Sequence, residues 1–335
     1  MTRPLRATSY DVARLAGVSQ SAVSRCFKPG ASISAKMRER VMAAARELGY
    51  QPNAMARGLI TKRSGLVAVF VASTMNFYYP DVLFQLTQRF ADTGMRVLLF
   101  TVDSEDDAQA ALDPVWQYSV DGVISASHLS GAQYEWLQER GIPVILFNRW
   151  FAERKTDSVA ADSADAVSEL VEHMVEGGHR RVALLHGPQG SMVGRTRIEQ
   201  VTAALARHGV EPVATAVGDY HYASGERAAA ELLPSRPTLI MAANDMMAMG
   251  LIDALRGTHA KRVPEDISVC GFDGIAAGQF APYQLTTVRQ PIGRMADAAA
   301  SLLMQRLEHE DISPETRRLG STLLLGRSTQ ALTDP

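Results

Sequence analysis

The hydrophobic pattern of the first fifty residues begins with one short amphipathic helix. Apolar Val12, Leu15 and Ala16 recur at helical spacing, which predicts that they share one buried face. Thr8 or Ser9 can cap the start of this helix, because a hydroxyl accepts a free backbone N–H there. Gly17 is expected to end it, since glycine readily adopts positive φ.

Two further helices follow in the same segment. Ser19 is expected to cap a second helix, and Ser34 a third that ends at Gly49. The inward positions are predicted to be Ala22, Val23 and Cys26 in the second helix, and Met37, Val41, Ala44, Ala45 and Leu48 in the third. The first two helices are joined by three residues, and this arrangement predicts a helix-turn-helix.

From residue 66 onward the pattern changes to short apolar runs separated by helical stretches. The runs are 66–72, 96–101, 121–127, 143–148, 181–187, 238–244, 267–273 and 321–326, and the helical stretches include 81–93, 161–176, 195–208 and 246–256. Buried strands that alternate with helices are typical of parallel sheets. The expected fold class is therefore an all-α helix-turn-helix head plus an α/β body with two doubly wound parallel-sheet lobes.

Polar side chains repeatedly follow the ends of the predicted strands. They are Ser73 and Asn76, Asn148 and Arg149, Asn244 and Asp245, and Asp273. In open α/β sheets, ligands bind outside the carboxyl ends of the strands. Two such lobes facing each other would enclose a ligand between them.

Charge is unevenly distributed between these two parts. Residues 1–65 contain 12 basic and 3 acidic residues, a net charge of +9, whereas the remainder has 22 basic against 33 acidic, or −11. A basic head on an acidic body is typical of a polyanion-binding module joined to a domain that does not bind the polyanion. A basic tail without a partner is the alternative that charge alone leaves open.

Composition argues against several classes of protein. The two cysteines, Cys26 and Cys270, are far apart and lack metal-ligand spacing, so neither a disulfide nor a zinc site is expected. No secretory signal and no membrane-spanning run are apparent, which predicts a cytoplasmic protein without membrane contact. We expect no catalytic residue, no metal and no cofactor.

The outward face of the second helix is the first candidate site. Gln20, Ser21, Ser24 and Arg25 are polar residues suited to base edges in a major groove. Ordinary solvated surface is the alternative. The basic charge of the surrounding segment favours the DNA-reading interpretation.

The segment after the third helix suggests a hinge. Pro52 ends one helix and Asn53 can cap another, but residues 54–60 give only one or two turns, too short to be stable alone. Leu59 is apolar among basic residues, which is typical of a side chain inserted into a minor groove. A linker whose leucine packs on its own domain is the alternative.

These motifs resemble the lactose-repressor (LacI-type) family of bacterial transcriptional regulators. The matching residues are Tyr10-Asp11-Val12-Ala13, Ala16-Gly17-Val18-Ser19, Val23-Ser24-Arg25 and Tyr50-Gln51-Pro52-Asn53 with Ala56 and Leu59. The resemblance implies DNA contacts at Thr8, Tyr10, Ser19, Gln20, Ser21, Ser24, Arg25, Asn53, Ala56, Arg57 and Leu59. The chain departs from the family at Ala22, where threonine is usual, and at Lys28, where asparagine is usual.

The resemblance continues through the body. It is marked by Gly177-Gly178-His179-Arg180-Arg181-Val182, Gly187-Pro188, Ala243-Asn244-Asp245, Gly271-Phe272-Asp273 and Leu285-Thr286-Thr287-Val288. It implies two lobes of periplasmic-binding-protein type, crossed by the chain near 157, 288 and 319. The implied domains are residues 1–51, a hinge at 52–65, and a body at 66–335. Lobe 1 would hold about 66–157 and 289–318, and lobe 2 about 158–288 and 319–335.

The same resemblance implies a ligand pocket lined from both lobes. The residues are Asn76, Phe77, Asn148, Arg149, Asp162, Ser191, Arg197, Tyr220, Asn244, Asp273 and Gln290. Their amide and charged groups suit vicinal hydroxyls, and Arg149 with Arg197 would also suit a carboxylate or phosphate. Gln200 and Tyr283 stand where relatives usually carry glycine and proline, so the ligand class does not simply transfer.

The expected function is that of a repressor of transcription. Its operator affinity would be controlled by a sugar, a sugar acid or a similar effector, as inducer or corepressor. The expected assembly is a homodimer on double-stranded DNA, localised to the nucleoid through that binding. A solute-binding or sugar-modifying protein without DNA regulation is the alternative, but the 187–196 segment lacks the glycine spacing and lysine of a phosphate loop.

Overall fold

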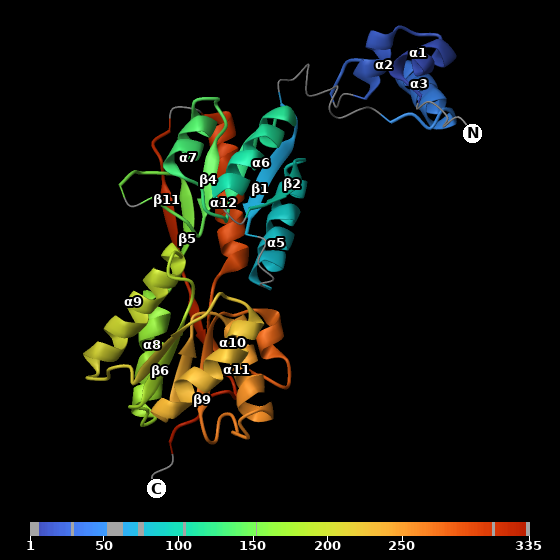
Figure 1. Cartoon of the computed structure of the whole chain (residues 1–335). Helices are drawn as coiled ribbons and strands as arrows, with labels where there is room; N and C mark the ends of the chain where they lie inside the picture. Colours follow the sequence, from blue (N-terminus) through green and yellow to red (C-terminus); the bar gives the residue numbers. More distant parts are fainter. Residues whose placement is uncertain are drawn as a thin grey trace. The chain divides into compact units, whose positions relative to one another are not determined.

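The computed structural model describes residues 7–27, 30–51, 63–72, 77–102, 105–151, 153–309 and 312–332. The chain divides into two compact units, the head Met1–Ser64 and the body Gly65–Pro335 (Figure 1). The division falls within the predicted hinge at 52–65. Residues 52–62 of that hinge lie outside the described residues.

The head consists of the three predicted helices, α1 (Ser9–Ala16), α2 (Gln20–Cys26) and α3 (Ala35–Glu47). Thr8 caps α1 in a reciprocal capping box with Asp11, and Gly17 ends it at φ 61°. Ser19 and Ser34 cap α2 and α3 through their hydroxyls. Local capping chemistry therefore accounts for where each helix begins.

Two predicted core positions of the head are wrong. Leu15 is 48% exposed and Leu48 is 36% exposed. Val12 of α1 and Val41 of α3 fill the small core as predicted, and Ala13 of α1 joins them. Helical spacing identifies a face of the helix, but it does not fix how wide a stripe of that face the other two helices cover.

The first lobe of the body is a six-stranded sheet in the order β11-β5-β4-β3-β1-β2. Its strands are β1 (Leu66–Val71), β2 (Arg96–Thr101), β3 (Gly122–Ser125), β4 (Val144–Phe147), β5 (Ser158–Asp162) and β11 (Thr316–Gly320). All its pairings are parallel. One face packs on α5 (Tyr78–Asp92) and α12 (Ile292–Glu308), and the other on α6 (Glu105–Gln117) and α7 (Gly131–Gln138).

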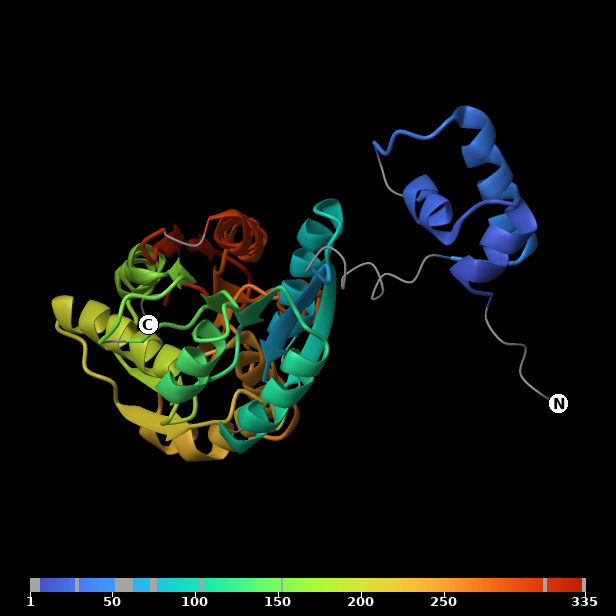
Figure 2. The same cartoon turned by 90° about the horizontal axis from the view of Figure 1, so that it is seen from above.

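The second lobe repeats this plan in the order β12-β10-β9-β8-β6-β7. Its strands are β6 (Val182–His186), β7 (Ala214–Val217), β8 (Leu239–Ala242), β9 (Ser268–Asp273), β10 (Thr286–Arg289) and β12 (Thr322–Leu324). Helices α8 (Ala164–Glu176) and α9 (Met192–Arg207) cover one face, and α10 (Tyr222–Leu232) and α11 (Asp245–Gly257) the other. Helices enclose the strands of the body in the view from above as well (Figure 2).

The chain crosses between lobes three times, close to the expected places. The first crossing was expected near 157, but residues 158–162 form β5 of the first sheet, so the chain crosses after Asp162. The second lies between β10 and α12, and the third at Ser321. The first and third crossings run side by side, since the Ser163 and Ser321 hydroxyls are 2.8 Å apart.

Several strands were not predicted, and the last one was predicted incorrectly. The missed strands are β5, β7, β10 and β11, which are short or carry polar residues, as in TTVR of β10. The apolar run 321–326 forms only β12, which pairs antiparallel with β10, so the second sheet is not purely parallel. Backbone pairing with a neighbouring strand can hold such segments without an apolar side-chain pattern.

Candidate nucleic-acid interface and ligand cleft

Helix α2 presents a polar face on the head. Gln20, Ser21, Ser24 and Arg25 are all exposed, while Ala22, Val23 and Cys26 of the same helix are buried. Three hydrogen bonds hold this face: Gln20 Nε2 donates to Ser9 Oγ at 3.3 Å, Arg25 Nε donates to the Ser21 carbonyl at 3.5 Å, and the Ser19 and Ser21 hydroxyls are 3.0 Å apart. These side chains can therefore turn to an external partner at little cost.

The other predicted DNA contacts of the head differ in their surroundings. Tyr10 is 70% exposed, whereas Thr8 and Ser19 use their hydroxyls to cap helices. Thr8 Oγ1 also donates to Asp11 Oδ2 at 2.7 Å. Asn53, Ala56, Arg57 and Leu59 lie outside the described residues.

A cavity of about 370 Å³ lies in the body between the two lobes. The strand ends of lobe 1 contribute Ala72, Val102, Ser127 and Asn148, and lobe 2 contributes residues 190–193 and Asp273 at the end of β9. This is the place where α/β sheets bind ligands. Its volume lies in the usual range for small-molecule sites.

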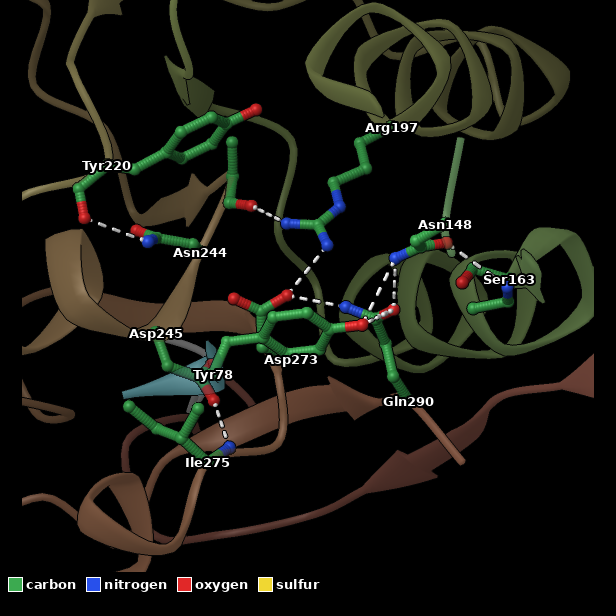
Figure 3. Close-up of polar contacts among 12 residues, drawn as sticks. Tyr78, Asn148, Ser163, Arg197, Tyr220, Asn244, Asp245, Asp273, Ile275 and Gln290 are labelled. Atoms are coloured by element: carbon green, nitrogen blue, oxygen red, sulfur yellow. Dashed lines mark hydrogen bonds and ion pairs between the residues drawn. The ribbon is translucent and has the colours of Figure 1, made fainter. Parts of the chain in front are cut away.

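A buried network of hydrogen bonds forms one wall of this cleft (Figure 3). Arg197 donates to Asp273 Oδ1 at 2.6 Å and to the Ala243 carbonyl at 2.7 Å. Gln290 Nε2 donates to the same Asp273 oxygen at 2.7 Å, and Asn148 Nδ2 donates to Gln290 Oε1 at 2.7 Å. Gln290, at the second crossing, therefore links Asn148 of lobe 1 to Asp273 of lobe 2.

Burial governs the protonation of this network. Burial raises the pKa of the Asp273 carboxyl, and the positive charge of Arg197 opposes that rise. For Arg197 burial acts to lower the pKa, but Asp273 and the nearby tyrosines outweigh it, so the net pKa is raised. The guanidinium also lies over the Phe272 ring, 4.0 Å from its centroid. The pair is therefore preformed, and its 2.6 Å contact favours the charged form against the effect of burial.

A second carboxyl lies behind this pair. Asp245 at the start of α11 is fully buried and accepts a hydrogen bond from Thr287 Oγ1 at 2.6 Å. It also accepts one from the Ile275 backbone N–H at 2.8 Å (Figure 3). Burial, together with the negative charge of Asp273, raises the pKa of Asp245 to about 8. The Asp245 carboxyl therefore keeps its proton at neutral pH.

Six of the predicted ligand residues line the cavity. They are Asn148, Arg149, Ser191, Arg197, Tyr220 and Asp273. Gln290 is buried beside them, and Asn244 is buried where it caps α11 and donates to the Tyr220 carbonyl at 3.0 Å. Phe77, 55% exposed, and Asp162 are not part of the lining, and Asn76 lies outside the described residues.

Several lining residues were missed by the sequence analysis. The most important are Tyr78 and Tyr79 at the start of α5, His128 after β3, and Arg195 in the first turn of α9. Their position just beyond strand ends was the available signal. The sequence analysis applied this signal to a few polar residues only, and these four were not among them.

The described residues contain neither a metal-binding cluster nor a membrane helix. No group of three or more histidine, cysteine, aspartate or glutamate side chains within them could hold a metal ion. Across the same described ranges, no helix has the length and apolar character needed to cross a bilayer.

Two family profiles match the chain. "Bacterial regulatory proteins, lacI family" matches residues 8–53, which cover the head helices. "Periplasmic binding protein-like domain" matches residues 171–329, which cover most of the second lobe. These matches agree with the two units of the fold.

Individual relatives match over nearly the full length. The HTH-type transcriptional regulator CelR of Thermobifida fusca is 32% identical over 340 residues, 98% of this chain and all of the relative. The structure of the lac repressor dimer bound to operator and an anti-inducer is 28% identical, with a TM-score of 0.87 over 97% of this chain and 99% of that one. A CelR–cellobiose complex is 29% identical, with a TM-score of 0.73 over 96% of this chain and all of that one.

Proposed function

Because the chain belongs to the lacI family of bacterial regulatory proteins, we propose that it represses transcription by binding an operator through its head, under control of a small molecule in its cleft. One observation carries this proposal. A polar, exposed α2 face on a head of charge +9 stands in the same chain as a 370 Å³ cleft lined from two lobes. Neither an enzyme nor a solute carrier needs both.

The proposed reading residues are those of the exposed α2 face. Arg25 can donate two parallel hydrogen bonds to a guanine, and Gln20 can pair with an adenine. Thr8, Tyr10 and Ser19 lie at or near the starts of α1 and α2, where we assign contacts to the DNA backbone. Asn53, Ala56, Arg57 and Leu59 are assigned to the hinge 52–65 on the motif alone.

The proposed effector is a sugar or a sugar derivative. Asn148, Ser191, Tyr220 and Asp273 provide hydroxyl, amide and carboxylate groups around one cavity, which suits a ligand with several hydroxyls. The cellobiose bound to the CelR relative supports this class. Because both lobes line the cavity, a ligand that binds one arrangement of the lobes more tightly shifts the population towards it.

We also propose a homodimer. Phe84 of α5, Leu99 of the edge strand β2 and Phe280 in lobe 2 are each at least half exposed, although all are large and apolar. Such side chains are favourable where a second copy covers them. The dimeric assembly of the operator-bound lac repressor supports this arrangement.

The test is an operator selection followed by titration. Randomised duplex DNA is enriched on the full chain, and the recovered site is titrated by fluorescence anisotropy against wild type and Arg25→Ala. We expect a two-fold symmetric site and a loss of about 1–3 kcal/mol for Arg25→Ala, with relaxed preference at one base pair per half-site. Arg207→Gln, at the far end of α9 in the body, removes the same charge and should have no effect.

The proposal also requires the effector to act on this complex. A sugar that raises the melting temperature should change operator affinity, and operator should change sugar affinity by the same factor. Recovery of no preferred sequence, or equal affinity of wild type and Arg25→Ala for every sequence, would contradict the assignment of operator reading to α2.

A further inference from the structure

The cleft has more positive than negative groups in its lining. Three arginines line it, Arg149 from lobe 1 and Arg195 and Arg197 from lobe 2, against the single carboxylate of Asp273. The body as a whole carries an excess of acidic residues. The cleft lining therefore has a net positive charge, opposite in sign to the body that forms it.

Asp273 compensates only one of these arginines. Its Oδ1 accepts from both Arg197 and Gln290, and Asp273 is 2% exposed. The charge of Arg197 is thus balanced within the protein. Arg149 and Arg195 form no ion pair with Asp273.

Within the described part of the chain, neither Arg149 nor Arg195 forms an ion pair. The Arg149 guanidinium donates to the carbonyl of Asn148 at 2.8 Å, and Arg195 is an exposed side chain. Some other arginines of the body do pair with an acid: Arg89 with Asp297, Arg154 with Glu135, Arg262 with Asp266 and Arg317 with Glu315.

The backbone adds positive potential at the same place. Ser191, Met192 and Val193 line the cavity at the start of α9, whose first turn contains no acidic residue. The N-terminal end of a helix carries a partial positive charge. A neutral ligand would leave both arginines without a counterion, whereas an anionic group would form charge-assisted hydrogen bonds with them.

We propose that the ligand of this cleft is anionic, a polyhydroxylated molecule whose carboxylate or phosphate group is bound by Arg149 and Arg195. This inference rests on the proposed function and names its effector class. Planar guanidinium groups match the geometry of both anions. Asn148, Ser191, Tyr220 and Asp273 remain for the hydroxyls, so one cavity holds the sugar ring and the charged group.

The test is isothermal titration calorimetry of the full chain with matched ligands. D-glucose is compared with D-glucuronate and glucose 6-phosphate, and D-galactose with D-galacturonate and galactose 6-phosphate. At least one anionic member should bind more tightly than its neutral parent, and raising the salt concentration should weaken only the anionic ligands. The carboxylate and phosphate arms show which anion the site takes.

Variants then locate the anion. Arg149→Gln and Arg195→Gln should each weaken the anionic ligand about 10- to 100-fold, as expected for loss of a charge-assisted hydrogen bond, and should leave the neutral sugars unchanged. Arg207→Gln is the matched control, because it lies on the same helix as Arg195, about 18 Å away along the axis. Circular dichroism melts verify that each variant is folded.

Two results would overturn the inference. One is that no anionic ligand binds more tightly than its neutral parent. An anionic ligand that shows no binding counts towards this result. The other is an anion preference that persists in both arginine variants. If a neutral sugar alone binds and shifts operator affinity, the proposed function stands and the inference fails. Loss of operator binding by the wild type would instead overturn the proposed function and leave the calorimetric comparison intact.

Discussion

Replacing Asp273 with asparagine would leave the Arg197 guanidinium buried beside a neutral amide. The Arg197 and Asp273 side chains are 10% and 3% exposed, and their nearest atoms are 2.6 Å apart. With charge centres about 4 Å apart and an effective dielectric constant near 20, the lost attraction is about 4 kcal/mol. Removing one partner of a buried ion pair generally costs about 3–5 kcal/mol. We therefore expect Asp273→Asn to lose a large share of the free energy of unfolding.

The assay is a double-mutant cycle by urea unfolding without ligand, using Asp273→Asn, Arg197→Met and the double variant. The double variant should be much less destabilised than the sum of the two single variants, because it leaves no uncompensated charge. The single variants should also differ in pH dependence. In Arg197→Met the buried carboxyl can take up a proton, so the loss should shrink as the pH falls, whereas an arginine in Asp273→Asn cannot lose its charge.

The exposed pair Arg89–Asp297 provides the control. Its contact is as short, 2.5 Å, but the two side chains are 32% and 57% exposed. Its cycle should give a coupling of less than about 1 kcal/mol. If the Arg197–Asp273 cycle gives an equally small coupling, the reasoning is refuted, because the pair would then not be preformed and dry in the empty cleft.

Three other predictions concern the packing of a glycine between two helices, the protonation of Asp245 and the edge strand of the first lobe. Gly225→Ala should destabilise the protein by about 1–3 kcal/mol in chemical unfolding, because the added Cβ would lie 2.0 Å from the Met247 carbonyl oxygen. Gly257→Ala, whose added Cβ would have no atom within 4 Å, should leave stability unchanged, and equal effects of the two variants would contradict the packing argument. In the native protein the pKa of Asp245 is raised to about 8, so this carboxyl keeps a proton that the unfolded chain loses above about pH 4. Stability should therefore fall as the pH rises from about 4 to 8 and stay level at higher pH. Urea unfolding at pH 5.5–8.5 should show this decline relative to Asp245→Asn; a constant difference would mean that the native carboxyl is ionised. Leu99→Lys on the edge strand β2 should yield monomers in analytical ultracentrifugation, and an unchanged dimer would place the interface elsewhere.

The features predicted best from sequence were those set by local chemistry. Thr8, Ser19 and Ser34 cap the head helices as expected, because a cap depends on residues within one turn. The long apolar runs of the body became strands for a similar reason, since burial on both faces requires a continuous apolar stretch. The exposed polar face of α2 was likewise readable from helical periodicity alone.

The features missed depend on contacts between distant segments. Gln290 meets Asn148 across 142 positions of sequence, and nothing near either residue indicates that contact. Strand β11 is held by pairing with β5, although its own residues are polar. Arg195 was not predicted as a ligand residue. Its importance depends on which carboxylates are already occupied, and that is a property of the folded cleft.

The three crossings also determine the order in which the protein can fold during synthesis. The first lobe needs α12 and β11, and β11 pairs with a strand that is 158 residues earlier in the chain. A ribosome that has completed β10 has therefore delivered nearly all of the second lobe, while the first still lacks the helix that covers one of its faces. Contacts of such long separation form slowly. The head has a core formed by its own three helices, so it can fold early, and a nascent chain would carry a folded head before either lobe is complete.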